Sequence, residues 1–138
     1  MPGPDADELM RAAAFRSELR RFLRRSEVLV AEVGLTPQRY DLLLQLKAAP
    51  EGHSTVTELG KRLYLRQTAV TELVKRAEEA GLVQRRRSDD DRRVFLLELT
   101  EDGDSRVTRV FNALRRDRAA FAQAFDELDL QFRASTEG

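Results

Sequence analysis

The sequence predicts a mainly α-helical chain with one small β-hairpin, a winged helix-turn-helix set between long terminal helices. Three observations predict this fold. Val56, Leu59 and Leu63 recur at helical spacing, and a second helical stripe follows after Tyr64-Leu65. Residues 82–87 and 94–99 have the composition of two short strands around a charged tip at residues 88–93.

The sequence predicts one long N-terminal helix over residues 5–33, which follows a disordered lead at residues 1–4. Acidic residues at its start suit the positive end of the helix dipole. A coiled-coil-like stripe alternates spacings of four and three, and further apolar residues widen it, so we expect the helix to pack against two partners. The stripe contains Phe15, Leu19, Phe22, Ser26, Leu29 and Val33, and the widening residues are Leu9, Ala12, Ala13 and Leu23.

A shorter helix follows Gly34. Thr36 is a suitable N-cap, and Pro37 suits the first helical position. The helix is expected to extend to about Ala48 and to direct Tyr40, Leu43 and Leu44 into the core. Pro50-Glu51-Gly52 then interrupts the chain.

The helix-turn-helix carries its own boundary signals. Thr55 followed by Glu58 forms a capping box, and Gly81 supplies a left-handed residue after the second helix. With the second helix's apolar side turned inward, short hydroxyls, an amide and basic side chains remain on its outer face. Such a face suits hydrogen bonding in a DNA major groove, although a solvated helix surface has the same composition. The inward residues are Val70, Leu73, Val74 and Ala77; the outward ones are Arg66, Gln67, Thr68, Thr71, Glu72 and Lys75.

The hairpin favours the DNA interpretation, because it concentrates positive charge. Its five cations are Arg85, Arg86, Arg87, Arg92 and Arg93. Guanidinium groups there suit phosphate contact and insertion into a narrow minor groove. Asp91 is expected to orient Arg93.

The C-terminal part predicts a helix that Thr100 caps and that begins at Glu101. No proline or glycine occurs between Gly103 and Gly138, which favours one long helix, straight or bent, over residues 101–133. A second helix capped by Asp126 is the alternative. The long helix would reach about 50 Å at roughly 1.5 Å per residue, too long for the remaining small domain to cover. We therefore expect the first and last helices to pack together and against the same helices of a second chain, as a homodimer. An intramolecular pair of helices is the alternative. The apolar stripe contains Val107, Phe111, Leu114, Phe121, Phe125, Leu128 and Phe132.

The residues from Leu65 to Leu82, the Asp91-x-Arg93 pair and Leu99-Thr100-x-x-Gly103 resemble the MarR family of winged helix-turn-helix transcriptional regulators. The chain departs from the family where Ser-Pro-Ser is common, since it has Arg66-Gln67-Thr68. The resemblance implies residues 1–35 and 100–138 for dimerisation and residues 36–99 for DNA binding. It also implies a repressor of transcription on a pseudo-palindromic operator in double-stranded DNA.

In that function, phosphate contacts are expected from the wing and from Lys61, Arg62 and Arg66, and base contacts from Gln67, Thr68, Thr71 and Lys75. The resemblance further implies release by a small aromatic or anionic effector. Residues that could line its crevice are Phe15, Arg16, Leu19, Arg20, Phe22, Leu43 and Phe111, and plain core packing is the alternative for each.

Overall charge adds a second hypothesis. The chain has 24 basic and 24 acidic residues among 138, so positive charge is local to the wing rather than general. A winged helix that binds an acidic protein partner is therefore an alternative function. The absence of a long apolar run and of a signal peptide predicts a cytoplasmic protein.

Catalysis and metal binding find little support in the sequence. His53 is the only histidine, expected to be exposed in a loop, and there is no cysteine. Asp89-Asp90-Asp91 lacks the glycine and distal glutamate of a calcium loop. We expect no enzyme, no cofactor and no bound metal.

Overall fold

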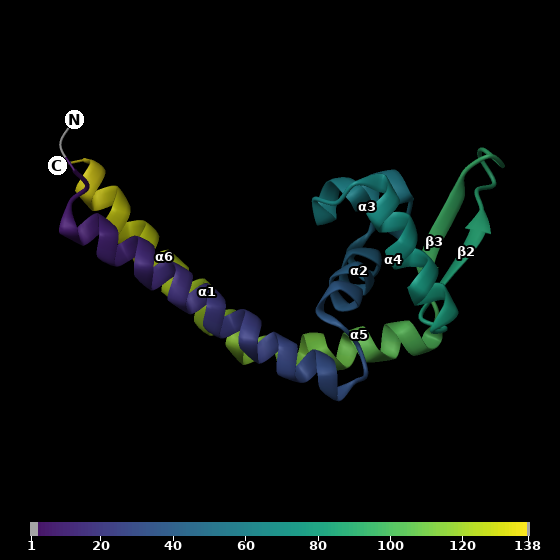
Figure 1. Ribbon diagram of the computed structural model, residues 1–138, viewed down its shortest axis with the longest axis horizontal. Helices are drawn as coiled ribbons and strands as arrows, with labels where there is room; N and C mark the ends of the chain where they lie inside the picture. Colours follow the sequence, from purple (N-terminus) through teal and green to yellow (C-terminus); the bar gives the residue numbers. More distant parts are fainter. Residues whose placement is uncertain (1–2, 138) are drawn as a thin grey trace. The chain divides into compact units, whose positions relative to one another are not determined.

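The computed structural model describes residues 3–137, except the side chains of residues 131, 132 and 135 (Figure 1). Met1 and Pro2 of the predicted N-terminal lead lie outside the described residues, as does the side chain of Phe132 in the predicted stripe. Two compact units form: Met1–Leu29 with Asn112–Gly138, and Val30–Phe111. No helix among residues 3–137 is both long and apolar enough to cross a lipid bilayer.

The first unit consists mainly of two long helices that lie side by side (Figure 1). Helix α1 spans Ala6–Glu32 and helix α6 spans Arg115–Thr136, so the predicted N-terminal helix is confirmed. Aromatic rings join them. The Phe15 ring centroid lies 5.7 Å from that of Phe125, and the Phe22 ring stacks on Phe121 at 5.5 Å. Part of the predicted Phe stripe therefore packs within one chain.

The second unit is built on helix α2, which spans Pro37–Ala48. The predicted cap is confirmed, because the Thr36 hydroxyl accepts a hydrogen bond from the backbone N–H of Arg39 at 3.2 Å. Tyr40 and Leu43 are buried as predicted, whereas Leu44 is only half-buried. Leu42 and Leu46 are completely buried as well, since α2 contacts two further α-helices and two strands.

A one-turn helix, η1 at Pro50–Gly52, leads into strand β1 at His53–Ser54. The prediction that His53 lies exposed in a loop was wrong. His53 is half-buried and pairs with Glu98, 45 residues further along the chain. Its strand pairs with an edge of strand β3, Phe95–Leu99, and the local sequence does not reveal a partner so far along the chain.

The helix-turn-helix follows as predicted. Helix α3 spans Val56–Leu63, and the Thr55 hydroxyl accepts from the backbone N–H of Glu58 at 3.2 Å. Helix α4 spans Gln67–Glu79, and Gly81 takes a left-handed conformation two residues beyond it. The inward residues of α4 pack against α3 and α2: Val70, Val74 and Ala77 are fully buried and Leu73 is half-buried.

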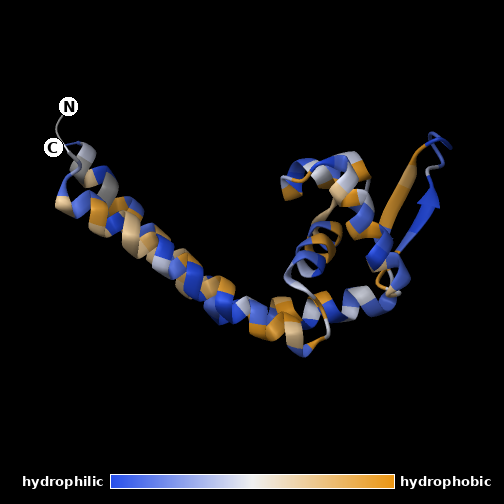
Figure 2. Cartoon of the chain, in the orientation of Figure 1, coloured by the Kyte–Doolittle hydropathy of each residue, from blue (hydrophilic) through white to orange (hydrophobic). Residues whose placement is uncertain are grey.

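The wing is the hairpin of β2, Val83–Arg87, and β3, Phe95–Leu99. The strands pair antiparallel from Val83 opposite Leu99 to Arg87 opposite Phe95, and the sheet order is β1-β3-β2. Figure 2 shows β2 as hydrophilic and β3 as hydrophobic. The sheet therefore buries its base at Leu82, Val83 and Leu97 and extends a charged strand into solvent.

Helix α5 spans Glu101–Ala113 and begins with the predicted cap. The Thr100 hydroxyl accepts from the Gly103 N–H at 3.1 Å and donates to the Gly81 carbonyl at 2.6 Å. Gly103 lies so close to the backbone of Leu82 that a Cβ atom there would overlap the Leu82 carbonyl oxygen.

The prediction of one helix over residues 101–133 was wrong. The helix breaks at Leu114, whose backbone has φ −87° and ψ 0°, and α6 then begins at Arg115. This conformation is open to any residue, so a break needs neither glycine nor proline. Asp126, the alternative cap, lies inside α6.

Candidate nucleic-acid interface

The outer face of α4 presents polar and basic side chains. Arg66 occupies the N-cap, where its guanidinium, which has only donors, forms no capping bond. The five residues predicted to face outward toward DNA are all exposed: Arg66, Gln67, Thr68, Thr71 and Lys75. The opposite face is buried, so α4 is amphipathic in the sense that a groove-binding helix requires.

Two residues on this face are partly engaged within the helix. The Thr71 hydroxyl donates to the Gln67 carbonyl at 2.9 Å, which leaves its oxygen lone pairs and methyl group outward. Glu72 forms an i, i+4 ion pair with Arg76 at 3.3 Å. Thr71 can therefore act on a base edge as an acceptor or an apolar contact, while Gln67 can both donate and accept.

Basic residues also flank the turn that precedes α4. Lys61 and Arg62 are both exposed in the last turn of α3. Lys61 approaches Glu58 at 3.5 Å, a long contact between exposed groups that contributes little stability. Both cations are therefore accessible to a phosphate.

The strand arginines of the wing are bound to the protein itself. Arg85 donates through Nε to both carboxylate oxygens of Glu78, at 3.2 and 3.0 Å. The hydrogen bond to Glu78 raises the pKa of Arg85. Arg86 pairs with Glu98 at 3.4 Å, and the Arg87 guanidinium lies 4.8 Å from the Phe95 ring centroid. Arg85 and Arg86 are thus paired with carboxylates of the protein.

The tip holds Arg92 and Arg93. Ser88 accepts from the backbone N–H groups of Asp90 and Asp91, which shapes the turn. The Asp91 carboxylate accepts from the Arg93 backbone N–H at 3.0 Å and from its Nε at 3.2 Å, so the predicted orientation of Arg93 is confirmed. These bonds lower the pKa of Asp91. The Arg93 side chain remains 92% exposed, and Arg92 is exposed beside it.

A family model described as MarR family matches residues 33–94, which contain the helix-turn-helix, β2 and the tip of the wing but not β3. The organic hydroperoxide resistance transcriptional regulator of Bacillus subtilis is 36% identical over 86 residues, 61% of this chain. A MepR-like protein of known structure is 30% identical to this chain with a TM-score of 0.60, and the match covers 95% of this chain and 87% of that protein. The chain belongs to the MarR family. The matched segment spans 56% of the length of the B. subtilis regulator.

Solved structures share the winged helix-turn-helix fold of this MarR chain. AbsC, a MarR-family transcriptional regulator from Streptomyces coelicolor, superposes with a TM-score of 0.76 at 20% identity, and the match covers 99% of this chain and 97% of AbsC. A mutant of MepR from S. aureus, solved bound to an oligodeoxyribonucleotide, gives a TM-score of 0.67 at 19% identity, and the match covers 91% of this chain and 92% of MepR. At these identities the likeness concerns the fold.

The residues that the MarR resemblance suggested for an effector crevice are divided between the two units. Phe15, Arg16, Leu19, Arg20 and Phe22 lie on α1 within the first unit, whereas Leu43 and Phe111 belong to the second. Leu43 is completely buried. Their role as an effector site stays a prediction.

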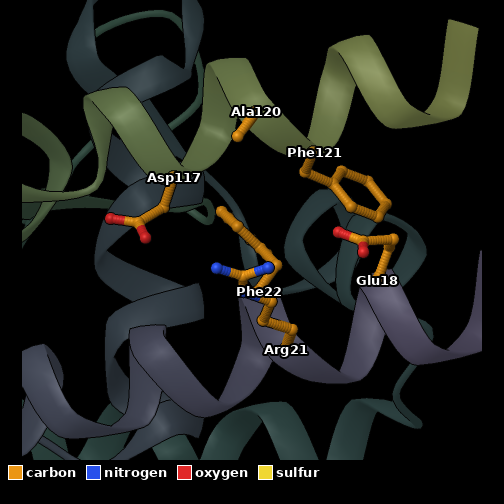
Figure 3. Close-up of a pocket in the computed structure, with 6 residues that line it drawn as sticks. All are labelled: Glu18, Arg21, Phe22, Asp117, Ala120 and Phe121. Atoms are coloured by element: carbon orange, nitrogen blue, oxygen red, sulfur yellow. The ribbon is translucent and has the colours of Figure 1, made fainter.

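Two hollows adjoin the aromatic rings of the first unit. One, of about 100 Å³, lies beside Phe22 and Phe121, and is also lined by Glu18, Arg21, Asp117 and Ala120 (Figure 3). Its volume is below the ~300 Å³ of a typical small-molecule site. The other, of about 280 Å³, is lined by Phe15, Phe125, Leu128 and polar residues that include Arg11. The Arg11 Nε and Nη2 atoms are buried without a hydrogen-bond partner among residues 3–137.

Sequence reasoning missed the carboxylates that hold the wing. Glu98 was detectable, because the hairpin register places it opposite Gln84, on the same face as Arg86. Glu78 carried no local signal, since its contact with Arg85 depends on how the end of α4 approaches β2. The exposed Tyr64 was also missed; its position in the helix-turn-helix turn was the only available signal.

Proposed function

We propose that this chain is a dimeric, sequence-specific DNA-binding regulator of transcription, a repressor that a small-molecule effector releases from its operator in the cytoplasm. One observation carries the proposal. The unit that buries one face of α4 leaves Gln67, Thr68 and Lys75 exposed on the other and holds Arg93 outward at the wing tip. A helix face and a guanidinium of this kind match a major groove and the adjacent minor groove.

The contacts divide by chemistry. Gln67, Thr68 and Thr71 offer amide, hydroxyl and methyl groups for base edges, and Lys75 adds a cation at the same face. Lys61, Arg62 and Arg66 supply phosphate contacts that set the register. Arg92 and Arg93 enter the minor groove, while Asp91 orients the second of them. Arg85, Arg86 and Arg87 support the wing and contact phosphates through the donors that their protein partners leave unused.

Dimerisation is supported by the apolar surface of the first unit. Six large apolar side chains on α1 and α6 are 46–69% exposed: Leu9, Met10, Leu23, Val28, Phe125 and Leu130. Exposed apolar side chains of this size suit an interaction surface in a soluble protein. A dimer would place two α4 helices on a pseudo-palindromic operator.

Effector release rests on the family resemblance and on the apolar hollow of about 280 Å³ near Phe15 and Phe125. Its size lies at the lower end of small-molecule sites. An aromatic or anionic compound would complement its rings and the Arg11 guanidinium. Compounds of this class should lower DNA affinity when added to the complex.

A salt titration tests the DNA-binding proposal. Binding of the full chain to mixed genomic DNA should weaken by about 10³–10⁵-fold between roughly 50 and 200 mM salt if six to ten phosphates are contacted. Arg116→Ala, an exposed α6 arginine outside the proposed interface, is the matched control and should leave the slope unchanged. Failure of the parent chain to bind DNA would favour the alternative, a winged helix that binds an acidic protein.

A further inference from the structure

Tyr64 occupies an unusual position in the turn of the helix-turn-helix. It is the C-cap residue of α3 and takes the left-handed conformation, with φ 55° and ψ 41°. The residue is 93% exposed, more than any other large apolar residue in the described part of the chain. A strained backbone and an exposed aromatic ring therefore coincide at one residue.

The left-handed conformation closes α3, because the Tyr64 backbone N–H donates to the Gly60 carbonyl, but this role does not require a tyrosine. A bulky side chain in the left-handed region is sterically disfavoured, whereas glycine adopts this conformation at little cost. The chain places glycine at three other positive-φ positions, Gly34, Gly52 and Gly81. The hydrogen bonds to Gly60 explain the left-handed backbone but not the choice of a bulky residue there, and the exposed ring therefore suggests a function for the side chain.

The surroundings of Tyr64 indicate which ligand it meets. The Leu65 N–H donates to the Gly60 carbonyl at 3.0 Å, which fixes the turn and leaves Leu65 half-buried while Tyr64 is in solvent. Exposed cations precede and follow it in sequence, at Lys61, Arg62 and Arg66. The phenol thus belongs to a positively charged segment that ends at the N-cap of α4.

We propose that the Tyr64 hydroxyl donates a hydrogen bond to a backbone phosphate of duplex DNA, beside the groove that α4 enters. This inference rests on the proposed DNA-binding function. Tyrosine hydroxyls are among the side-chain donors that bind phosphate oxygens and fix a protein's register on the duplex. The phenol ring has few rotatable bonds, so it reaches the phosphate with little loss of conformational entropy.

The test compares Tyr64→Phe and Tyr64→Gly with the parent chain on sheared, mixed-sequence duplex DNA over a salt series. Both variants lose the hydroxyl, and both should weaken binding by about tenfold, because a dimer loses two hydrogen bonds to charged groups. The salt slope should stay unchanged, since no cation is removed. Tyr64→Gly should also raise the Tm by about 2–4 °C through relief of the left-handed strain.

Glu51→Gly is the matched control. Glu51 is the other non-glycine residue with positive φ among residues 3–137, at 60°, and it is exposed outside the proposed interface. This variant relieves similar strain and should not weaken DNA binding. If either Tyr64 variant binds DNA as tightly as the parent chain, the inference is overturned while the proposed function stands. If the parent chain itself does not bind DNA, the proposed function is overturned, and the inference about Tyr64 with it.

Discussion

Asp91 holds Arg93 with both oxygens of its carboxylate. Oδ1 accepts from the Arg93 backbone N–H and Nε, and Oδ2 lies 3.4 Å from Nη2. The acid thus fixes the backbone and the guanidinium of the same residue, although the Arg93 side chain is almost fully exposed. An exposed arginine normally samples many rotamers, so this pair reduces the entropy that Arg93 would lose on entering a groove.

Arg93→Ala and Gln67→Ala should affect DNA binding in different ways. Arg93→Ala removes a cation that reads groove width, so it should weaken binding to all sites, lower the salt slope and flatten any preference for A·T-rich flanks. Gln67→Ala should keep the slope and relax choice at one symmetric pair of positions, by about 1–3 kcal/mol per base contact. A salt series and a randomised operator library measure both effects. If Arg93→Ala binds DNA as the parent chain does while Gln67→Ala abolishes the salt dependence of binding, the two roles are assigned the wrong way round.

The Asp91–Arg93 pair should also titrate. Since Arg93 lowers the pKa of Asp91 below its ordinary 3.8, the pair stabilises the folded tip above that pH. This contribution is lost as the pH falls through the lowered pKa of the folded chain. The Arg93 backbone amide should therefore shift in an NMR titration with a midpoint below 3.8. Asp91→Asn should abolish that transition, and a midpoint at or above the ordinary value would contradict the role given to Arg93.

Replacing Phe121 and Phe125 together by aspartate should dissociate the proposed dimer. Both rings contact Phe15, and Phe125 is partly exposed, so the change places two carboxylates in an apolar surface. Sedimentation should show a monomer. The control changes both residues to leucine, which keeps apolar area and should keep the dimer. An aspartate variant that sediments as the parent dimer would place the interface elsewhere.

Gly103→Ala should destabilise the chain by at least about 1–3 kcal/mol, the usual cost of overpacking. The added methyl group overlaps the Leu82 carbonyl oxygen, and a backbone group cannot rotate away as a side chain can. Urea unfolding should show a lower midpoint with the same m-value. Ser105→Ala, at an exposed position of the same helix, should stay within about 0.5 kcal/mol of the parent chain. Equal midpoints for the two variants would refute this packing.

Peroxide should not change DNA affinity at levels that leave methionine intact. The similar B. subtilis regulator is named for organic hydroperoxide resistance, but this chain contains no cysteine that could be oxidised reversibly. A gel-shift assay before and after treatment measures the effect. Release from DNA that a reductant reverses would reveal a sensing chemistry other than the thiol route.

Local chemistry made much of the fold predictable. Thr36, Thr55 and Thr100 cap helices by hydrogen bonds to residues three positions ahead, so their signals lie within one turn of the sequence. The break at Leu114 was not predictable, because no residue there has a restricted backbone. The strand at His53 depends on a partner 45 residues away. The outer face of α4 was predictable from helical periodicity. The pairing of Arg85 with Glu78 was not, because it depends on how the end of α4 packs against β2 in the folded chain.

The bond between Glu78 and Arg85 joins the last turn of α4 to the first part of the wing. In the proposed complex with DNA, this bond would help to keep α4 and β2 at one spacing along the duplex. An operator should therefore tolerate a changed base within either contacted segment better than an inserted base pair between them. One inserted base pair rotates the two contacted DNA segments relative to each other by about 34–36°. We expect α4 and the wing, held together by this bond, to lose contact with one of them.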